Sequence, residues 1–283
     1  MKIAVIADPH ANFIALQAVS EHIASWQPDH VIVAGDLVNR GPRPAQCLDF
    51  VLDRQQNAGW RLVRGNHEDY VIDQAGSQDG RNGPTSEVHR PSYWTYQQLA
   101  CDISALQAMP FQQSIYDPSG AELRFVHASM TSNRDGIYPE SRDPEIKSKL
   151  KLGNPGISRL PVLVCVGHTH RPFVRESNGL LVVNAGSSGL PFDGDPRPSY
   201  AQIIRVNGRW KASIVRVEYD RQQAESDFTS SGYLDGGGPL VKLVLIELRT
   251  ASSQLFYWAT RFQEQALAGR ISVADSVGKY LAG

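Results

Sequence analysis

Cysteine is scarce in this sequence. The 283 residues include three, Cys47, Cys101 and Cys165, and they lie far apart along the chain. No C-x-x-C pair exists, which argues against a thiolate metal site or a redox dithiol. We expect the three to behave as small buried hydrophobic residues.

Long hydrophobic runs are also missing. The apolar run at the N-terminus is interrupted by Asp8 and Pro9, so it is too short to be the core of a signal peptide. No other run approaches the roughly 20 apolar residues that span a bilayer. We therefore expect a cytoplasmic protein with no membrane partner.

Excess charge of either sign is absent as well. The formal net charge is -1, so bulk charge gives no indication of a nucleic-acid partner. The 41% hydrophobic and 20% charged content is ordinary for a globular protein. A chain of 283 residues is long enough for one large α/β domain or two small ones.

Hydrophobic runs and helical spacing alternate through the first part of the chain. Ile3–Ala7, Val31–Ala34 and Trp60–Val63 read as buried strands. Asn12–Trp26 has apolar residues at helical spacing, and Pro44 can begin a second helix. This order predicts parallel βαβ units with right-handed crossovers.

Further strands are predicted in the second half of the chain. Glu122–Val126, Val162–Val166 and Leu181–Val183 have the composition of core strands. Asn207-Gly208 separates two strand-like segments, 202–206 and 213–217, and this dipeptide is a strong hairpin signal.

The remaining segments are predicted from their composition. Residues 76–92 are rich in Gly, Asn, Ser and Pro and predict a long loop, followed by a helix over Thr95–Met109. Residues 221–238 are polar and end in three glycines, which predicts a linker or mobile loop. Residues 239–283 predict a helical tail that packs on the core or on another subunit.

Polar side chains follow five of the predicted strands, at the edge where ligands bind in open α/β sheets. They are Asp8, His10, Asp36, Asn66, His67, His127, His168 and His170. Carboxylate, amide oxygen and imidazole without thiolate suit Mn, Fe, Zn, Co or Ni. Seven candidate ligands are too many for one ion, but they suit two ions about 3.5–4 Å apart that share a carboxylate and a water.

Each of these residues also has a simpler interpretation when it is taken alone. An isolated aspartate such as Asp36 is commonly a cap or a turn former. A lone histidine such as His127 is more often a core or surface residue. The full set, in this order and with each member at a strand end, nevertheless predicts a metal centre.

These motifs resemble those of the calcineurin-like metallophosphoesterase superfamily. The resemblance covers residues 8–170 and rests on D-x-H, G-D-x-x-x-R-G, G-N-H-E, a single strand-end histidine and G-H-x-H, in that order. Residues 35–42 and 64–68 resemble serine/threonine protein phosphatases and bacterial diadenosine tetraphosphatases. The G-H-T-H-R-P segment resembles small bacterial phosphodiesterases instead. The resemblance ends before about residue 220.

The resemblance implies a fold and a division of the chain. The fold is a four-layer α/β/β/α sandwich of two mixed β-sheets flanked by helices, here with a C-terminal helical extension. Residues 1–220 would form the catalytic domain, 221–238 a linker or loop, and 239–283 a helical tail packed on the core or in a homodimer interface.

The resemblance also implies the roles of individual residues. One metal ion would be held by Asp8, His10, Asp36 and His170, and the other by Asp36, Asn66, His127 and His168. A hydroxide that bridges the two divalent or trivalent ions would attack phosphorus. His67 would protonate the leaving alkoxide, and Arg40 would bind the phosphate oxygens with its planar fork.

Two residues depart from the family pattern. Asn39 takes the place of an aspartate that supports the catalytic histidine in the protein phosphatases, so His67 should be a weaker acid-base group here. Ala11 stands where the family often has glycine, and alanine requires a negative φ or accepts some strain.

The sequence therefore predicts a dinuclear metal-dependent phosphoesterase. A phosphomonoester or phosphodiester would be its substrate, with small molecules and nucleotides favoured. Phosphoprotein (Ser/Thr) phosphatase activity is the alternative. A catalytically inactive metal-binding scaffold is a third possibility, because Asn39 departs from the pattern and the tail is unmatched.

Overall fold

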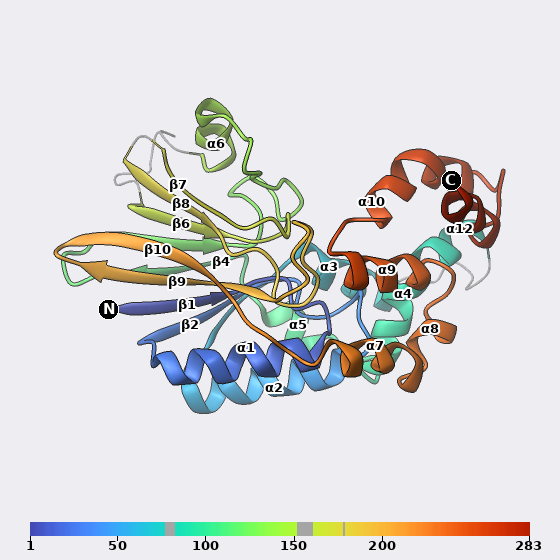
Figure 1. Cartoon of the computed structure of the whole chain (residues 1–283), viewed down its shortest axis with the longest axis horizontal. Helices are drawn as coiled ribbons and strands as arrows, with labels where there is room; N and C mark the ends of the chain where they lie inside the picture. Colours follow the sequence, from blue (N-terminus) through green and yellow to red (C-terminus); the bar gives the residue numbers. More distant parts are fainter. Residues whose placement is uncertain (77–82, 152–160, 178) are drawn as a thin grey trace.

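Two five-stranded mixed β-sheets pack face to face in the computed structural model, which describes residues 1–76, 83–151, 161–177 and 179–283 (Figure 1). The first sheet has the strand order β10-β9-β1-β2-β3, and the second has the order β4-β5-β6-β8-β7. The strands are β1 (Lys2–Ile6), β2 (His30–Ala34), β3 (Arg61–Val63), β4 (Gln112–Tyr116), β5 (Glu122–Val126), β6 (Leu163–Val166), β7 (Phe173–Ser177), β8 (Leu180–Asn184), β9 (Ser199–Val206) and β10 (Arg209–Arg216).

Each sheet has three parallel strands, with antiparallel strands at one edge of the first sheet and at both edges of the second. β1, β2 and β3 run parallel in the first sheet, and β5, β6 and β8 run parallel in the second. The predicted βαβ units and central strands are therefore confirmed. Because parallel strands point the same way, the residues that follow β1, β2 and β3 meet at one edge.

The hydrophobic core lies between the two sheets and on their outer faces. Alternate residues of β1, such as Ile3 and Val5, belong to one buried hydrophobic cluster with Leu123 and Phe125 of β5. The outer face of the first sheet is covered by α1 (Phe13–Trp26) and α2 (Pro44–Ala58), and α6 (Asp143–Lys149) packs on the second sheet. These layers form the predicted α/β/β/α sandwich (Figure 1).

The first helix begins and ends where local chemistry allows. The Asn12 side chain accepts a hydrogen bond from the backbone N–H of Ala15, which caps the N-terminus of α1. Gln27 adopts a left-handed conformation and ends the helix. Helix α2 has Pro44 in its first turn, where a missing N–H costs nothing.

The predictions between the third and fifth strands are partly wrong. Residues 84–92, expected to be loop, belong to α4 (Pro84–Gln98), which follows α3 (Asn66–Gly76); residues 77–82 of the predicted loop lie outside the described residues. The helix predicted over Thr95–Met109 is interrupted. Ala100 and Cys101 have φ values of 52° and 60°, so the chain turns there before α5 (Ser104–Ala108) begins.

The predicted linker or loop over 221–238 is wrong as a description of structure. It contains α7 (Arg221–Ser230) and α8 (Tyr233–Gly236). Asp220 caps α7, and Arg43, just before α2, makes an ion pair of 2.7 Å with Asp227 on α7. The segment is therefore fixed to the core, while the division of the chain into domains stays a prediction.

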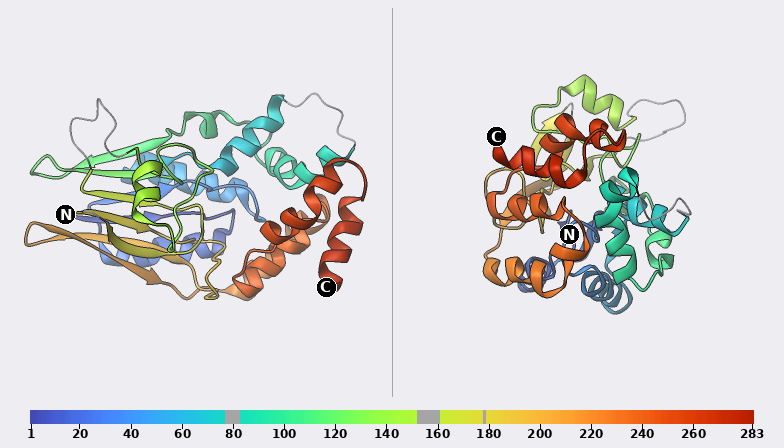
Figure 2. Two further views of the ribbon diagram at one scale, coloured as in Figure 1. Left: turned by 90° about the horizontal axis from the view of Figure 1, so that it is seen from above. Right: turned by 90° about the vertical axis from the view of Figure 1, so that its right-hand side faces the viewer.

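The tail is helical, as expected. It comprises α9 (Val241–Thr250), α10 (Leu255–Trp258), a π-helical turn η1 (Ala259–Gln263), α11 (Glu264–Leu267) and α12 (Val273–Ala282). Figure 2 shows these helices grouped at the end of the molecule away from the hairpin of β9 and β10. A homodimer through this tail stays a prediction.

The hairpin is confirmed, with β9 and β10 paired on either side of Asn207-Gly208. The antiparallel edge strands β4 and β7 were not predicted. Cys47 and Cys165 are buried, but Cys101 is exposed in the turn after α4, so the expectation for that residue is wrong.

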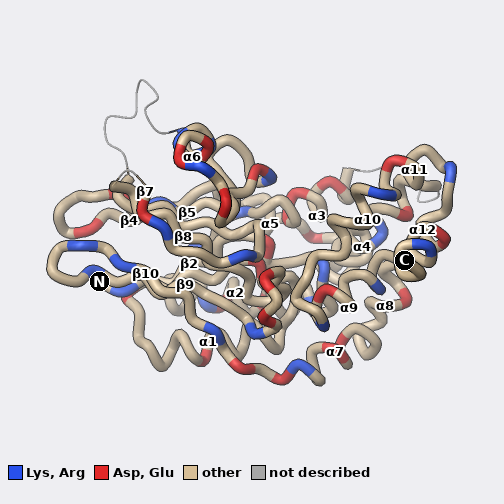
Figure 3. The backbone as a smooth tube through the Cα atoms, turned by 45° about the horizontal axis from the view of Figure 1, so that its top comes forward, with Lys and Arg blue, Asp and Glu red and all other residues tan. Residues whose placement is uncertain are grey.

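Charged residues of both signs are interspersed along the chain (Figure 3). No helix among the described residues is both long and apolar enough to cross a membrane.

Candidate metal centre

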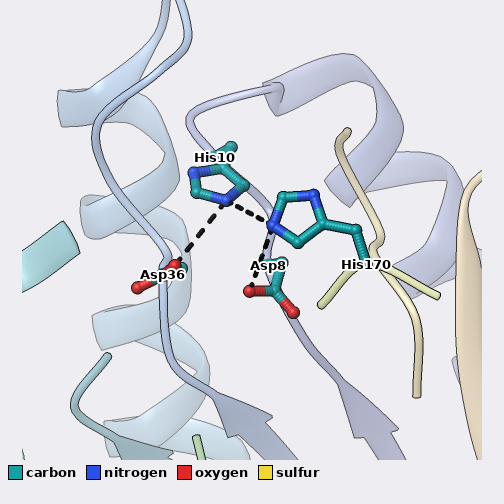
Figure 4. A group of neighbouring side chains, drawn as sticks. All are labelled: Asp8, His10, Asp36 and His170. Carbon is teal, nitrogen blue, oxygen red and sulfur yellow. Dashed lines mark hydrogen bonds and ion pairs between the residues drawn. The ribbon is translucent and has the colours of Figure 1, made fainter. Parts of the chain in front are cut away.

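Four predicted ligands gather where β1 and β2 end. Asp8, His10, Asp36 and His170 have ligand atoms within 4.8 Å of one another, and all four are buried. Figure 4 shows their side chains pointing toward one another from the loops after β1 and β2 and from the loop that carries His170. The Nε2 atoms of His10 and His170 lie 3.0 Å apart, and His170 Nε2 lies 3.5 Å from Asp8 Oδ1.

A second group lies beside the first. Asp36, His127 and His168 also have ligand atoms within 4.8 Å of one another. Asn66 joins them, because its Oδ1 lies 3.0 Å from His127 Nε2 and 2.9 Å from His168 Nδ1. The structure thus brings together all seven residues predicted as metal ligands, in the two predicted sets.

Asp36 is common to both groups. Its Oδ2 lies 3.7 Å from His10 Nε2 in the first group and 3.3 Å from His127 Nε2 in the second. Its other oxygen, Oδ1, accepts a hydrogen bond of 2.9 Å from the backbone N–H of His67. One carboxylate oxygen is therefore fixed by the backbone, while the other faces both sets of imidazoles.

These spacings fit metal ions. Ligand atoms bonded to one ion at about 2.1 Å are about 3.0–3.4 Å apart in octahedral or tetrahedral geometry. The shortest separations within the two groups, 2.9–3.3 Å, match or closely approach this range. Buried imidazole nitrogens that face one another have no good arrangement without an ion or a proton between them.

The backbone selects which imidazole nitrogen faces the centre. Nδ1 of His10 lies 3.3 Å from the Asn39 carbonyl, and Nδ1 of His127 lies 2.9 Å from the Ala34 carbonyl. Nδ1 of His170 likewise bonds the Leu190 carbonyl. A protonated Nδ1 donates these bonds, so in the neutral form of each ring Nε2 presents its lone pair to the centre.

Burial keeps most of the site histidines neutral. It lowers the pKa of His10 to about 3 and that of His168 to about 4, and it holds the pKa of His67 and His170 well below the usual value. His127 differs. Burial opposes its protonation, but the carboxylates of Asp36 and Asp8 outweigh this effect and raise its pKa to about 10.

The two carboxylates also differ. Burial raises the pKa of Asp8, with help from the nearby charges of Asp36 and Glu68. Burial acts in the same direction on Asp36, but the neighbouring His127, His67 and His10 hold the pKa of Asp36 well below its usual value. The shared carboxylate is therefore the more firmly ionised of the two.

The site backbone is strained. Eight non-glycine residues of the site loops have positive φ values between 46° and 71°: Asp8, His10, Ala11, Asp36, Asn39, Arg40, His168 and His170. A left-handed conformation costs roughly 1–2 kcal/mol for a residue with a Cβ. Ala11, expected to need a negative φ or to accept strain, has a φ of 52° and so accepts the strain. Such clustering is typical of functional sites.

Glu68 holds the loop that carries Asp36, a role that was not predicted. It is fully buried and accepts hydrogen bonds from the backbone N–H groups of Asp36, Leu37, Val38 and Gly65, at 2.8–3.2 Å. Burial raises its pKa to about 7, although the bonds from these N–H groups favour the carboxylate. The sequence feature that could have indicated this role is Glu68 itself, the acidic residue at the end of the G-N-H-E motif.

Asn39 contacts His67. Its Oδ1 accepts a hydrogen bond of 2.9 Å from the backbone N–H of Arg40, so its Nδ2 is the atom that faces His67 Nδ1, also at 2.9 Å. An amide nitrogen only donates, and His67 Nδ1 must therefore accept. The remaining proton of a neutral His67 is then on Nε2.

Ser92 and Thr95 of α4 complete the setting of Asn39. Asn39 Nδ2 donates to Ser92 Oγ at 3.0 Å, and Thr95 Oγ1 lies 3.4 Å from Asn39 Oδ1. Neither residue was singled out in the sequence, because α4 was expected to begin later.

Arg40 lies close enough for its charge to act on the site histidines. It contributes to lowering the pKa of His10, His67 and His170. No described residue accepts a hydrogen bond from its guanidinium. This group is therefore available to an anion at the centre.

Comparison with a family model identifies the class of protein. Residues 1–207 match the model of the calcineurin-like phosphoesterase superfamily domain. An uncharacterized protein of Methanocaldococcus jannaschii is 28% identical over 244 residues, which are 78% of this chain and 89% of that protein. A symmetrical bis(5'-nucleosyl)-tetraphosphatase of Actinobacillus pleuropneumoniae is 34% identical over 70 residues, 24% of this chain and 25% of that enzyme.

Solved structures have the same fold. A metallophosphoesterase of Sphaerobacter thermophilus matches 89% of this chain and 100% of its own, with a TM-score of 0.66 and 27% identity. A hypothetical protein of Pyrococcus horikoshii also matches 89% of this chain and covers 99% of its own, with a TM-score of 0.72 and 18% identity. Both matches extend beyond the 207 residues of the family domain into the C-terminal helices.

Proposed function

The chain belongs to the calcineurin-like phosphoesterase superfamily, and we propose that it is a dinuclear metal-dependent phosphoesterase acting on a small phosphomonoester or phosphodiester. The superfamily depends on metals, and the Asp and His residues gathered here could hold them. The observation that carries the proposal is the position of Asp36 Oδ2, which faces His10 in one ligand group and His127 in the other.

The residues would hold two ions in the sets described above. Asp8, His10, Asp36 and His170 form one set, and Asp36, Asn66, His127 and His168 form the other. Two such transition-metal ions, Mn, Fe, Zn, Co or Ni, would activate a water for attack on phosphorus and offset the charge of the phosphoryl oxygens.

Arg40 and His67 would act on the substrate itself. The guanidinium of Arg40, which donates to no described residue, would bind two phosphoryl oxygens with its parallel N–H groups. His67 presents an Nε2–H, because Asn39 donates to its Nδ1. A neutral imidazole of this kind stabilises the leaving oxygen by a hydrogen bond, and leaving groups that need little protonation would be favoured.

Burial supports a small substrate. His67 is 6% exposed, and the ligands other than His168 are buried. Arg40 is only partly exposed and lies within range of buried residues of the C-terminal helices. A phosphate on a small molecule or a nucleotide end reaches such a site more readily than a phosphorylated side chain on a folded protein.

The test is hydrolysis of a substrate panel by the purified protein. An aryl phosphomonoester, a bis-aryl phosphodiester and diadenosine tetraphosphate are each supplied with Mn²⁺ or with a chelator. We expect turnover on at least one, lost on chelation and lost in Arg40→Ala. Bound metal with no turnover on any of the three would contradict the proposal and favour a metal-binding scaffold.

A further inference from the structure

Two buried polar atoms of the C-terminal helices have no hydrogen-bonding partner within the described part of the chain. They are Tyr233 Oη on α8 and Glu247 Oε2 on α9. Both residues are fully buried. Native proteins seldom leave such groups unsatisfied, and those that remain need an explanation.

The two oxygens of Glu247 have different surroundings. Oε1 accepts hydrogen bonds from the backbone N–H groups of Gln254 and Leu255, at 2.7 and 2.8 Å, where α10 begins. Oε2 accepts none. A structural role at the start of α10 thus accounts for one carboxylate oxygen and leaves the other unexplained.

Arg40 is the complementary group. Burial raises the pKa of Glu247 and of Tyr233, and the positive charge of Arg40 opposes the rise in both. The Arg40 guanidinium carries five N–H donors, and no described residue accepts from them. The Arg40 guanidinium, for which the described residues provide no acceptor, therefore lies within electrostatic range of Glu247 and Tyr233, each with an oxygen for which they provide no donor.

Packing places these helices against the metal centre. The Tyr233 ring lies 4.5 Å from that of Trp94, whose neighbours Ser92 and Thr95 bond Asn39, the residue before Arg40. Phe192 belongs to the same hydrophobic cluster as Tyr233 and stacks on His170 at 4.3 Å. The cluster thus reaches the site from two sides.

We propose that Glu247 and Tyr233 are positioning residues for Arg40, so that the C-terminal helices complete the active site. Glu247 Oε2 and Tyr233 Oη would accept N–H groups on the side of the guanidinium that faces away from the metals. The fork of Arg40 would then point at the phosphate, with three of its five N–H donors left, two of them for the phosphate oxygens. The inference rests on the proposed function, since it assigns Arg40 to phosphate.

The test is a double-mutant cycle with two readouts. Glu247→Gln and Tyr233→Phe keep the shape of each side chain, and each is made in the native chain and in Arg40→Ala. Orthophosphate binding to the Mn²⁺-loaded protein is measured by calorimetry, and kcat and KM are measured with an aryl phosphate. Ser276→Ala is the control, because it removes a buried hydrogen bond with Trp258 within the same tail.

We expect Glu247→Gln to weaken phosphate binding about tenfold and to raise KM more than it lowers kcat, as for loss of one charge-assisted contact. Tyr233→Phe should have a smaller effect in the same direction. In Arg40→Ala neither change should weaken binding further, and Ser276→Ala should leave phosphate binding unchanged.

Three outcomes would overturn the inference. Glu247→Gln and Tyr233→Phe could leave phosphate binding unchanged, they could weaken it equally with and without Arg40, or Ser276→Ala could weaken it as much. In each case intact hydrolysis by the native chain would leave the proposed function standing. No metal-dependent hydrolysis and no phosphate binding by the native chain would overturn the proposed function itself, and this inference with it.

Discussion

Asn39 donates a hydrogen bond from Nδ2 to Nδ1 of His67, at 2.9 Å, and its own orientation is fixed by the backbone N–H of Arg40. The bond makes Nδ1 an acceptor and leaves the proton of a neutral His67 on Nε2. An aspartate at this position would instead accept from Nδ1–H and favour the imidazolium.

Asn39→Asp is therefore expected to change which leaving groups are accepted. The imidazolium form of His67 can transfer a full proton to a basic alkoxide, which the neutral form cannot. We expect the ratio of kcat/KM for an alkyl phosphate to that for an aryl phosphate to rise about tenfold or more. Asn39→Ala, which removes the contact without adding charge, is the control; an unchanged ratio in Asn39→Asp would contradict the account.

Glu68→Gln is expected to destabilise the loop that carries Asp36. Each carboxylate oxygen of Glu68 accepts hydrogen bonds from two backbone N–H groups. In glutamine, an NH₂ group would replace one of these oxygens and face two N–H groups without accepting from them. We expect the free energy of unfolding to fall by about 2–4 kcal/mol, as for a broken buried network. Urea denaturation measures this.

A matched carboxylate gives the comparison for Glu68. Glu122→Gln removes a partly buried charge that pairs with Arg124 on the same strand, far from the Asp36 loop in sequence. This substitution should lower the free energy of unfolding by no more than about 1 kcal/mol. Equal losses of unfolding free energy in the two variants would show that the N–H bonds to Glu68 contribute no more to stability than the ion pair of Glu122 with Arg124.

Metal binding is expected to release a proton from His127. Its pKa is raised to about 10, so the metal-free protein carries this proton at neutral pH, whereas a metal ligand must be neutral. Affinity should therefore rise with pH through the neutral range. Calorimetric titration with Mn²⁺ at pH 7, in buffers of different ionisation enthalpy, should report about one proton released per chain.

His10 provides the internal comparison for that titration. Its pKa is lowered to about 3, so it is already neutral and has no proton to lose. His10→Asn should keep the proton release while it weakens the other ligand group. A binding enthalpy that does not vary with the buffer would refute the assignment of the proton to His127.

Two glycine substitutions separate backbone strain from packing. Gly208 has a φ of 79° in the β9–β10 turn, Gly278 lies in α12, and a Cβ added to either meets nothing within 4 Å. Gly208→Ala should lower the free energy of unfolding by about 1 kcal/mol, because alanine resists the left-handed conformation. Gly278→Ala should raise it by about 0.5–1 kcal/mol. Thermal unfolding that moved both variants the same way would be inconsistent with this.

The gathering of the candidate ligands was predictable because each of them follows a hydrophobic run. Asp8, Asp36 and His127 stand directly after segments whose burial is evident in the sequence, and parallel strands bring such ends together. The αL backbone at Asp8 and Asp36 was not predictable, because it is imposed by the loops that hold the site.

The helices beside the site were harder to predict because composition misleads there. Pro84 and Pro91 suggested a loop, yet Pro84 is in the first turn of α4, where proline is favoured, and Pro91 lies within the helix. Tyr233 and Glu247 carried no motif at all. Their proposed relation to Arg40 joins segments about 200 residues apart, which no local pattern encodes.

The most direct test of the account is the metal content of purified protein loaded with Mn²⁺, measured per chain by elemental analysis beside turnover of an aryl phosphate. Because Asp36 is shared by both ligand groups, the account predicts two ions in the native chain and one in His10→Ala or His168→Ala. It also predicts loss of tight binding of both ions, and of turnover, in Asp36→Asn. An Asp36→Asn protein that kept two ions and full turnover would contradict the account.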